Sequence, residues 1–487
     1  MIQINKIEEG VAAIDIGSQS YFVAVANQPV RQFGTFTGEI RQVAEYLRGQ
    51  GVQRVAMEAT GVYWIPLHDY LDSNSFEVTV FNGAGARNMP GRKTDVADCR
   101  APFRAGHAML HSHGLLHSCF IPPAEIRELR TYYRIREGHL ESSTRCIHQM
   151  QKYLDLMNVR LHNVISQIHG VSGLRVIEAI LAGERDAVRL AGLCDAQILK
   201  RKRPEVLASL EGTWDEHHLF GLRQALEGYR FFQAQMVACD REIERLLEEL
   251  NQGKPPAPQT EGKKGTSKGT SKGRHNAPQI ADLHGKLVTL CNGCDATVLP
   301  GISPTNLLKL VGEVGTDLSA WPTEKHFTAW LGLAPTRHES GKRRKRVKRR
   351  KTAAGQIFKE AVMGVASSKD QALGAFYRRI KGKKGPAVAN TATARKIAEL
   401  FYRAMTQGLE YVEEGVHRYD QRYREQSIRR VQKMAQQLGL TVVESTLEPA
   451  ICAQVHISRE DEQSGCGVSA GVIKRRLRLT DTEDQTV

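Results

Sequence analysis

Val11-Ala12-Ala13-Ile14-Asp15-Ile16 is an apolar run that carries a single acidic residue near its end. Its length, and the turn-forming Gly17-Ser18-Gln19-Ser20 that follows, predict a buried strand. A second run, Val55-Ala56-Met57-Glu58, has the same form and also ends on a carboxylate. Carboxylates at the ends of two such strands can converge on a hard cation such as Mg²⁺, which takes oxygen ligands. The two runs therefore predict an α/β domain that holds a metal site.

Residues 11 to 120 show three strand patterns followed by helices and strands in alternation. The expected elements are strands Val11–Ile16, Tyr21–Ala26 and Gln32–Thr37, helix Glu39–Arg48, strand Gln53–Glu58, helix Val62–Asp72, strand Val78–Phe81 and a helix through Asp95 and Asp98. On that last helix the two aspartates are three residues apart and share one face. The order resembles the ribonuclease-H-like layout, in which the first strand, the fourth strand and a late helix supply the metal ligands.

Apolar residues between 124 and 168 follow spacings of three and four, with breaks near Arg136 and Ser143. This pattern predicts a long coiled-coil-like helix, and a second stretch from Leu219 to Leu250 predicts another. An antiparallel pair within one chain and a coiled coil between chains both fit the pattern. We expect the intermolecular arrangement by a small margin, and with it a homo-oligomer, a dimer or a tetramer.

The net charge of +15 is concentrated in one part of the chain. Residues 251–400 carry 28 basic and 10 acidic side chains, a local excess of +18. From Lys342 to Lys351 only Val347 is uncharged, which predicts contact with a polyanion rather than a merely solubilising stretch. The residues expected to bind nucleic acid are Lys342, Arg343, Arg344, Lys345, Arg346, Lys348, Arg349, Arg350 and Lys351.

The amino-acid composition divides residues 251–487 into a linker, a domain and a tail. Residues 251–280 contain Pro-rich and Gly/Lys/Ser/Thr-rich repeats, which are typical of a flexible linker. A mainly helical domain is expected over 281–425, followed by a poorly defined tail, 426–487. At the start of that domain, Leu299-Pro300-Gly301-Ile302-Ser303 has the form of a turn between helices that would expose backbone N–H groups to a phosphate.

Ser340 lies directly ahead of the basic run, in Pro335-Thr336-Arg337-His338-Glu339-Ser340-Gly341. A serine hydroxyl becomes a competent nucleophile when a metal ion or dense positive charge stabilises its alkoxide. The simpler interpretation is a Ser-Gly turn that opens a loop. Local sequence leaves both interpretations open.

The acidic set, with Glu58-Ala59-Thr60-Gly61-Val62-Tyr63-Trp64 and Lys93-Thr94-Asp95-Val96-Ala97-Asp98, resembles the DEDD transposases of the insertion-sequence one-ten family, relatives of the Piv/MooV DNA invertases. Leu299–Ser303, Trp330–Pro335 and Glu339-Ser340-Gly341 resemble the second conserved domain of that family. The resemblance covers about residues 11–120 and 281–405. This chain departs from the frequent Ser-Gly-Gly motif, because Lys342 follows Gly341.

The resemblance implies a RuvC-like catalytic domain over 1–120, a helical region over 121–250 and a serine-containing transposase domain. It makes Asp15, Glu58, Asp95 and Asp98 the ligands of Mg²⁺ or Mn²⁺, and Ser340 the nucleophile that forms a covalent phosphoserine. The implied partners are donor and target DNA and a non-coding bridge RNA.

Other classes of protein stay open on sequence alone. A RuvC-like nuclease or resolvase would use water, with Ser340 only structural. Ile14-Asp15-Ile16-Gly17-Ser18 also fits the first phosphate loop of an actin-like ATPase, and a non-catalytic nucleic-acid-binding protein is a third possibility. The chain has no run of eighteen apolar residues and no signal-peptide pattern at its start, so we expect a cytoplasmic protein. The resemblance to the transposase family implies a bacterial protein that associates with the nucleoid.

Overall fold

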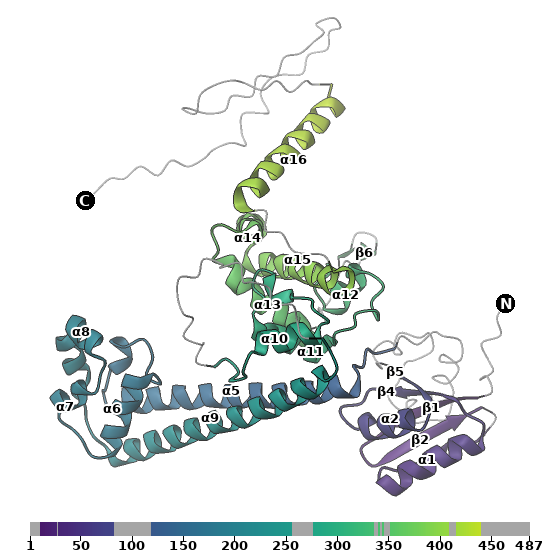
Figure 1. The fold of residues 1–487 in the computed structure, drawn as a ribbon, viewed down its shortest axis with the longest axis horizontal. Helices are drawn as coiled ribbons and strands as arrows, with labels where there is room; N and C mark the ends of the chain where they lie inside the picture. The colour runs from purple at the N-terminus through teal and green to yellow at the C-terminus, as the bar shows by residue number, and fades with distance from the viewer. Residues whose placement is uncertain are drawn as a thin grey trace, which may run out of the picture. The chain divides into compact units, whose positions relative to one another are not determined.

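The computed structural model describes residues 10–26, 28–81, 118–255, 276–335, 339–340, 343–344, 351–408 and 415–439. In these ranges the chain forms a mixed five-stranded sheet with helices, followed by a mostly helical remainder (Figure 1). It divides into two compact units, Met1–Ala124 and Glu125–Val487. None of the described helices is long and apolar enough to span a bilayer.

The elements of the first unit follow the predicted order. They are β1 (Val11–Ile16), β2 (Ser20–Val25), β3 (Arg31–Gly34), α1 (Thr37–Gly49), β4 (Arg54–Glu58), α2 (Trp64–Ser73) and β5 (Glu77–Phe81). β3 ends three residues earlier than expected because α1 begins at Thr37, where the carboxylate of Glu39 accepts a hydrogen bond from the backbone N–H of Phe36 at 3.2 Å. The helix predicted through Asp95 and Asp98 lies outside the described residues.

The sheet has the strand order β3-β2-β1-β4-β5. β1 pairs with β4 in parallel and with β2 antiparallel, and β2 pairs antiparallel with β3. Because side chains alternate between the two faces of a strand, Ile14 and Ile16 of β1 pack in one core with Leu47 of α1 and Leu67 of α2. Asp15 therefore points to the opposite face of the sheet.

In its described residues the second unit is built from helices apart from one two-stranded pair. Its elements are α5 (Ala124–Leu156), η2 (Leu161–Asn163), α6 (Val171–Leu181), α7 (Ala187–Gly192), α8 (Ala196–Ser209), α9 (Glu216–Asn251), α10 (Leu283–Leu290), η3 (Ala296–Val298), α11 (Pro304–Val314), α12 (Glu324–Trp330), β6 (Glu339–Ser340), β7 (Arg343–Arg344), α13 (Ala353–Ala366), α14 (Ala372–Lys384), α15 (Pro386–Gln407) and α16 (Gly415–Gln437).

The two long helices predicted from the apolar spacing are present as α5 and α9, and they lie side by side within one chain (Figure 1). The contacts run antiparallel, from Arg245–Glu128 at one end through Gln233–Ser143 at 3.1 Å to Gly221 against the ring of Tyr153. The expected intermolecular coiled coil is therefore wrong for these two faces. Each helix buries its apolar stripe against the other, as an antiparallel helical hairpin does.

The first of these helices is shorter than predicted. The periodic pattern extends to Ile168, but α5 ends at Leu156. Asn158 has the left-handed φ of +57°, and the N–H of Val159 bonds back to the carbonyl of Leu154 at 2.9 Å, which is how a left-handed residue closes a helix end. The apolar residues after it, such as Leu161 and Ile168, lie outside the helix and are buried in one core with α6, α7, α8 and the adjoining end of the α5–α9 hairpin.

The polar residues at the two breaks in the apolar pattern, Arg136 and Ser143, are buried between α5 and α9. Arg136 is 4% exposed and its Nε donates to Asp240 of α9 at 2.5 Å. Asp240, 2% exposed, also accepts from the backbone N–H of Gln279 at 2.9 Å, and Arg136 donates to the carbonyl of Asn276 at 3.2 Å. The ion pair thus joins both long helices to the segment that leads into α10.

Asp240→Ala is expected to lower the free energy of unfolding of the second unit by about 3–5 kcal/mol, because it leaves the Arg136 guanidinium buried without its counter-charge. Urea unfolding of the full chain measures the change. Glu249→Gln on the same helix is the matched control. Its partner Arg245 is 45% exposed, so a loss under about 1 kcal/mol is expected there. Equal losses for both variants would contradict a special role of the buried pair.

A second buried charge connects α5 to α11. The carboxylate of Glu313 is bonded by the hydroxyl of Tyr133 and by Arg134 at 2.7 Å, while Arg130 donates to the backbone carbonyls of Gly312 and Glu313. Burial raises the pKa of Tyr133, so its hydroxyl stays protonated and donates. A Cβ on Gly312 would lie 2.7 Å from the Tyr133 ring, so only glycine permits this close approach.

The C-terminal domain packs around aromatic side chains of three helices. Phe327 of α12, Phe358 of α13 and Phe401 of α15 are fully buried, and the rings of Phe358 and Phe401 are 5.5 Å apart. Gly301, at φ +82°, is so close to α13 that a Cβ would lie 2.2 Å from the carbonyl oxygen of Ala361. Leu299 and Ile302 beside it are buried. The expectation of a turn exposed to phosphate is wrong, because this turn packs against α13.

Candidate active site

Asp15 and Glu58 lie at the same edge of two neighbouring parallel strands. The pairing of β1 with β4 runs from Val11 opposite Arg54 to Ile14 opposite Met57. The next position along both strands is Asp15 beside Glu58. Laterally adjacent residues of a sheet point to the same face, so both carboxylates lie on the face opposite α1 and α2.

The face of the sheet opposite α1 and α2 combines small buried residues with partly exposed carboxylates. Ala13 and Ala56, one pleat before the two acids, are 3% and 0% exposed, whereas Asp15 and Glu58 themselves are of intermediate exposure. The carboxylates therefore remain accessible beside a closely packed strand pair. Their oxygens are hard donors, which fits one part of a Mg²⁺ ligand set.

The other two members of the acidic set, Asp95 and Asp98, lie outside the described residues. Among the residues that the structure does describe, no group of three or more His, Cys, Asp and Glu side chains is arranged to hold a metal. Of the four predicted metal ligands, the structure therefore describes two, Asp15 and Glu58.

Ser340 is in a short strand of the second unit. β6 pairs antiparallel with β7, and Ser340 is opposite Arg343 in that register. Only two residues, Gly341 and Lys342, separate the strands in the sequence, as in a tight hairpin. The backbone of Ser340 is therefore paired with Arg343, one of the basic residues of the run.

The basic run itself is described only in part. Arg343 and Arg344 form β7, and Lys351, at the end of the run, is exposed just before α13. The remaining members, Lys342, Lys345, Arg346, Lys348, Arg349 and Arg350, lie outside the described residues.

A hollow of about 410 Å³ lies beside the segment that leads to Ser340. Leu333 and Pro335 form one side of it, and α14 and α15 contribute the rest, including Phe376 and Arg395. Glu399 accepts from Arg395 at 2.9 Å and from Lys396 at 3.1 Å, so one carboxylate faces two cations there. Pro335 is five residues ahead of Ser340, so this mixed apolar and cationic hollow is close to it along the chain.

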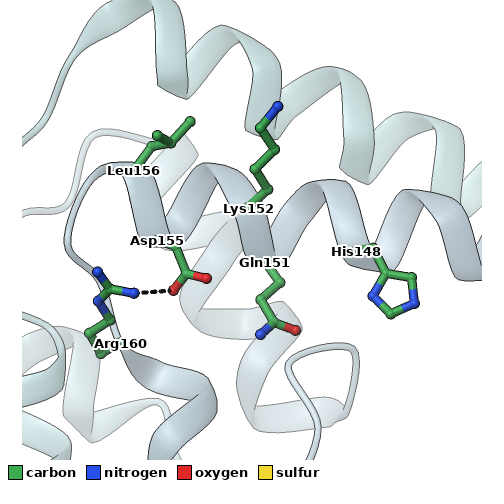
Figure 2. Close-up of a pocket in the computed structure, with 6 residues that line it drawn as sticks. All are labelled: His148, Gln151, Lys152, Asp155, Leu156 and Arg160. Atoms are coloured by element: carbon green, nitrogen blue, oxygen red, sulfur yellow. Dashed lines mark hydrogen bonds and ion pairs between the residues drawn. The ribbon is translucent and has the colours of Figure 1, made fainter.

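Another hollow, of about 480 Å³, lies on the surface of α5 (Figure 2). Figure 2 shows Asp155 bonded to Arg160, at 3.1 Å, with Lys152 and His148 along the helix. None of the residues predicted for the chemistry lines this hollow, and its one carboxylate is paired.

Sequence reasoning missed one set of basic residues. Residues 401–487 carry 12 basic and 13 acidic side chains, so a count over this whole segment gives almost no net charge. The structure shows that α16 occupies 415–437, and this helix alone has six basic and two acidic residues. Counting charge over the helix instead of the whole tail would have found it.

Two protein-family models match the chain, in the two regions where the sequence resembles the transposases. The IS110-type DEDD transposase model matches residues 12–159, which include β1 apart from Val11, all of β4 and all of α5. The model of the transposase IS116/IS110/IS902 family matches residues 296–378, which include Ser340. No curated protein matches the chain. The two matches, in this order along one chain, show that the protein belongs to the IS110 family of transposases, enzymes that act on DNA.

Proposed function

We propose that this transposase cuts and rejoins DNA strands by way of a covalent phosphoserine at Ser340, with a Mg²⁺ or Mn²⁺ site made of Asp15, Glu58, Asp95 and Asp98. The observation that carries the proposal is the position of Asp15 beside Glu58 on adjacent parallel strands. An actin-like ATPase accounts for Asp15 alone, whereas a metal-dependent phosphodiester enzyme accounts for both carboxylates and for the basic run.

The sheet supports a ribonuclease-H-like assignment of the first unit. Its strand order β3-β2-β1-β4-β5, with β2 running against the other four strands, agrees with the layout expected from the sequence. In that layout the ligands come from the first and fourth strands, which are β1 and β4 here. In that layout a late helix adds the third and fourth ligands, and we assign that role to Asp95 and Asp98.

In the proposed reaction the hydroxyl oxygen of Ser340 forms a bond to the scissile phosphorus while the bond from phosphorus to the leaving strand breaks. The leaving strand takes up a proton and departs as a free hydroxyl end. A hydroxyl end of a second strand then attacks the phosphoserine, and Ser340 regains its proton. When bound, the metal would polarise the phosphate and stabilise the negative charge of the transition state. The cationic segment from Lys342 to Lys351 would hold the phosphates of the backbone.

The remaining parts of the proposal concern organisation and partners. We assign catalysis to residues 1–120 and 281–425, a helical spacer to 121–250, a linker to 251–280 and a tail to 426–487. A non-coding bridge RNA would select donor and target DNA, and the active enzyme would be a homo-oligomer in the cytoplasm, at the nucleoid.

The test is to incubate the full chain with Mg²⁺, the RNA that copurifies with it and a labelled DNA that carries the ends of its element. A denaturing gel should show a labelled protein–DNA adduct, and ribonuclease treatment beforehand should remove it. Cleavage without an adduct would identify a nuclease that uses water and overturn the phosphoserine. An adduct that resists ribonuclease would overturn the RNA guide.

A further inference from the structure

A dense positive charge outside the proposed active site lies on two contacting helices near the C-terminus. α14 has five basic residues and no acidic residue, and α16 has six basic and two acidic residues. Together they hold eleven positive and two negative side chains, a net +9. The family matches end at residue 378, so nearly all of this surface lies beyond them.

Aromatic and cationic side chains anchor the first part of α16 to α14. The guanidinium of Arg379 is 4.0 Å from the ring centroid of Tyr423 and 5.2 Å from that of Tyr419. The ammonium of Lys383 bonds to the hydroxyl of Tyr423 at 3.1 Å, and this bond lowers the pKa of that tyrosine. Contacts of this kind between cations and ring faces orient one helix against the other.

Beyond Tyr423 the helix is open to solvent, and Figure 1 shows it continuing past α14. No described side chain between 415 and 439 is buried. Apolar residues such as Met434, 55% exposed, have no core to enter. Most of the stability of helices in proteins comes from tertiary packing of an apolar face, and the described residues provide little of it for this part of α16.

The cations of α16 are arranged as one stripe. Arg418, Arg422, Arg429 and Lys433 follow spacings of four, seven and four, which places them on one face of a helix. All four are exposed, and they extend over about 22 Å at 1.5 Å per residue. Arg429 and Lys433 form no ion pair with any residue in the described ranges. The stripe therefore offers an exposed line of charge to an external anion.

We propose that α16 binds duplex DNA, with the helix in the major groove and its basic stripe on the phosphates of the groove wall. A helix with its side chains is about 10–12 Å across, and the major groove of B-form DNA is about 12 Å wide. The anchored end at Tyr419 and Tyr423 would fix the direction of entry. The proposal depends on the DNA-directed function of the family but not on the serine chemistry.

Duplex RNA offers the same phosphates but a different shape. The major groove of A-form RNA is deep and too narrow for a helix. An exposed single helix with a cationic stripe therefore matches B-form DNA better. The ring faces of Tyr419 and Tyr423 are already occupied by Arg379, so they do not offer the stacking platform that single strands use.

The test compares the full wild-type chain with the variant R418Q/R422Q/R429Q/K433Q. Glutamine removes the charge and keeps the helix propensity. Fluorescence anisotropy with a duplex of random sequence, about 30 base pairs long, across a salt series should show an affinity at least about tenfold weaker. The log–log slope of affinity against salt should fall by roughly four, about one for each phosphate that the variant no longer neutralises. An unchanged slope would overturn the proposal.

The matched control removes the same charge elsewhere. Lys200, Arg201, Lys202 and Arg203 are four consecutive exposed basic residues on α8, and K200Q/R201Q/K202Q/R203Q should leave the slope within about one unit. An equal loss in this control would show that total charge, not α16, is responsible, and would overturn the proposal. An equal loss with an RNA hairpin of the same length would also overturn it in favour of an RNA partner. At saturating DNA the α16 variant should still form the covalent adduct, which separates this proposal from the proposed chemistry.

Discussion

Ser340→Ala is expected to abolish the covalent protein–DNA adduct completely while leaving the affinity for nucleic acid unchanged. The substitution removes the only atom proposed to bond to phosphorus and leaves the cations of the adjacent run in place. Because Ser340 is paired with Arg343 through the backbone, alanine keeps the hairpin. Denaturing gels after incubation with DNA and Mg²⁺ measure the adduct, and anisotropy measures the affinity.

Ser319→Ala is the matched control, because Ser319 is an exposed serine of the same unit. It should form the adduct at the wild-type rate. Persistence of the adduct in Ser340→Ala would show that another residue is the nucleophile. Loss of both adduct and binding would place Ser340 in DNA recognition instead of chemistry.

Asp15→Asn is expected to reduce strand cleavage at saturating Mg²⁺ by at least about a hundredfold. Loss of even an outer-shell partner of a metal site typically costs about 10–100-fold, and Asp15 is proposed as a direct ligand. Asparagine keeps the shape of the side chain and the pairing of β1, so the thermal unfolding midpoint should stay close to that of the wild type. Quantifying cleaved labelled DNA at a series of Mg²⁺ concentrations provides the measurement, and chelation of the metal should abolish cleavage by the wild type.

Glu77→Gln provides the control for that substitution, since Glu77 is an exposed acid at the start of β5 in the same sheet. Its cleavage rate should match that of the wild type. If Asp15→Asn cleaves DNA as fast as Glu77→Gln, the strand-end carboxylates do not bind the metal. A fall in both variants would point to a general effect of negative charge on the sheet.

Local patterns identified the order of the described elements of the first unit. The apolar run from Val11 to Ile16 is β1 at the predicted bounds, and Glu58 ends β4 as expected. Each of these strands buries one continuous apolar stretch, so composition and length identify it without tertiary information. The same local patterns placed Asp15 and Glu58 at strand ends, but their adjacency depends on the parallel pairing of β1 with β4.

The helical hairpin shows where local patterns fail. The spacing of three and four continues past Leu156, yet the left-handed Asn158 ends α5, and the later apolar residues enter the same core from outside that helix, beside α6, α7 and α8. Periodicity reports which residues need burial but not what buries them. For the same reason Arg136 looked like a break, whereas Asp240, 104 residues later, makes it part of the interface.

Contiguous residues were enough to identify the family, the order of the described elements in the first unit, the two long helices and the positions of the candidate carboxylates and serine in the chain. Three features became visible only in the folded chain: Asp15 lies beside Glu58, α5 and α9 pair within one chain, and α16 presents a basic stripe with little packing around it. These features depend on contacts between residues far apart in the chain, or on how little packs around a helix, and no local spacing encodes either.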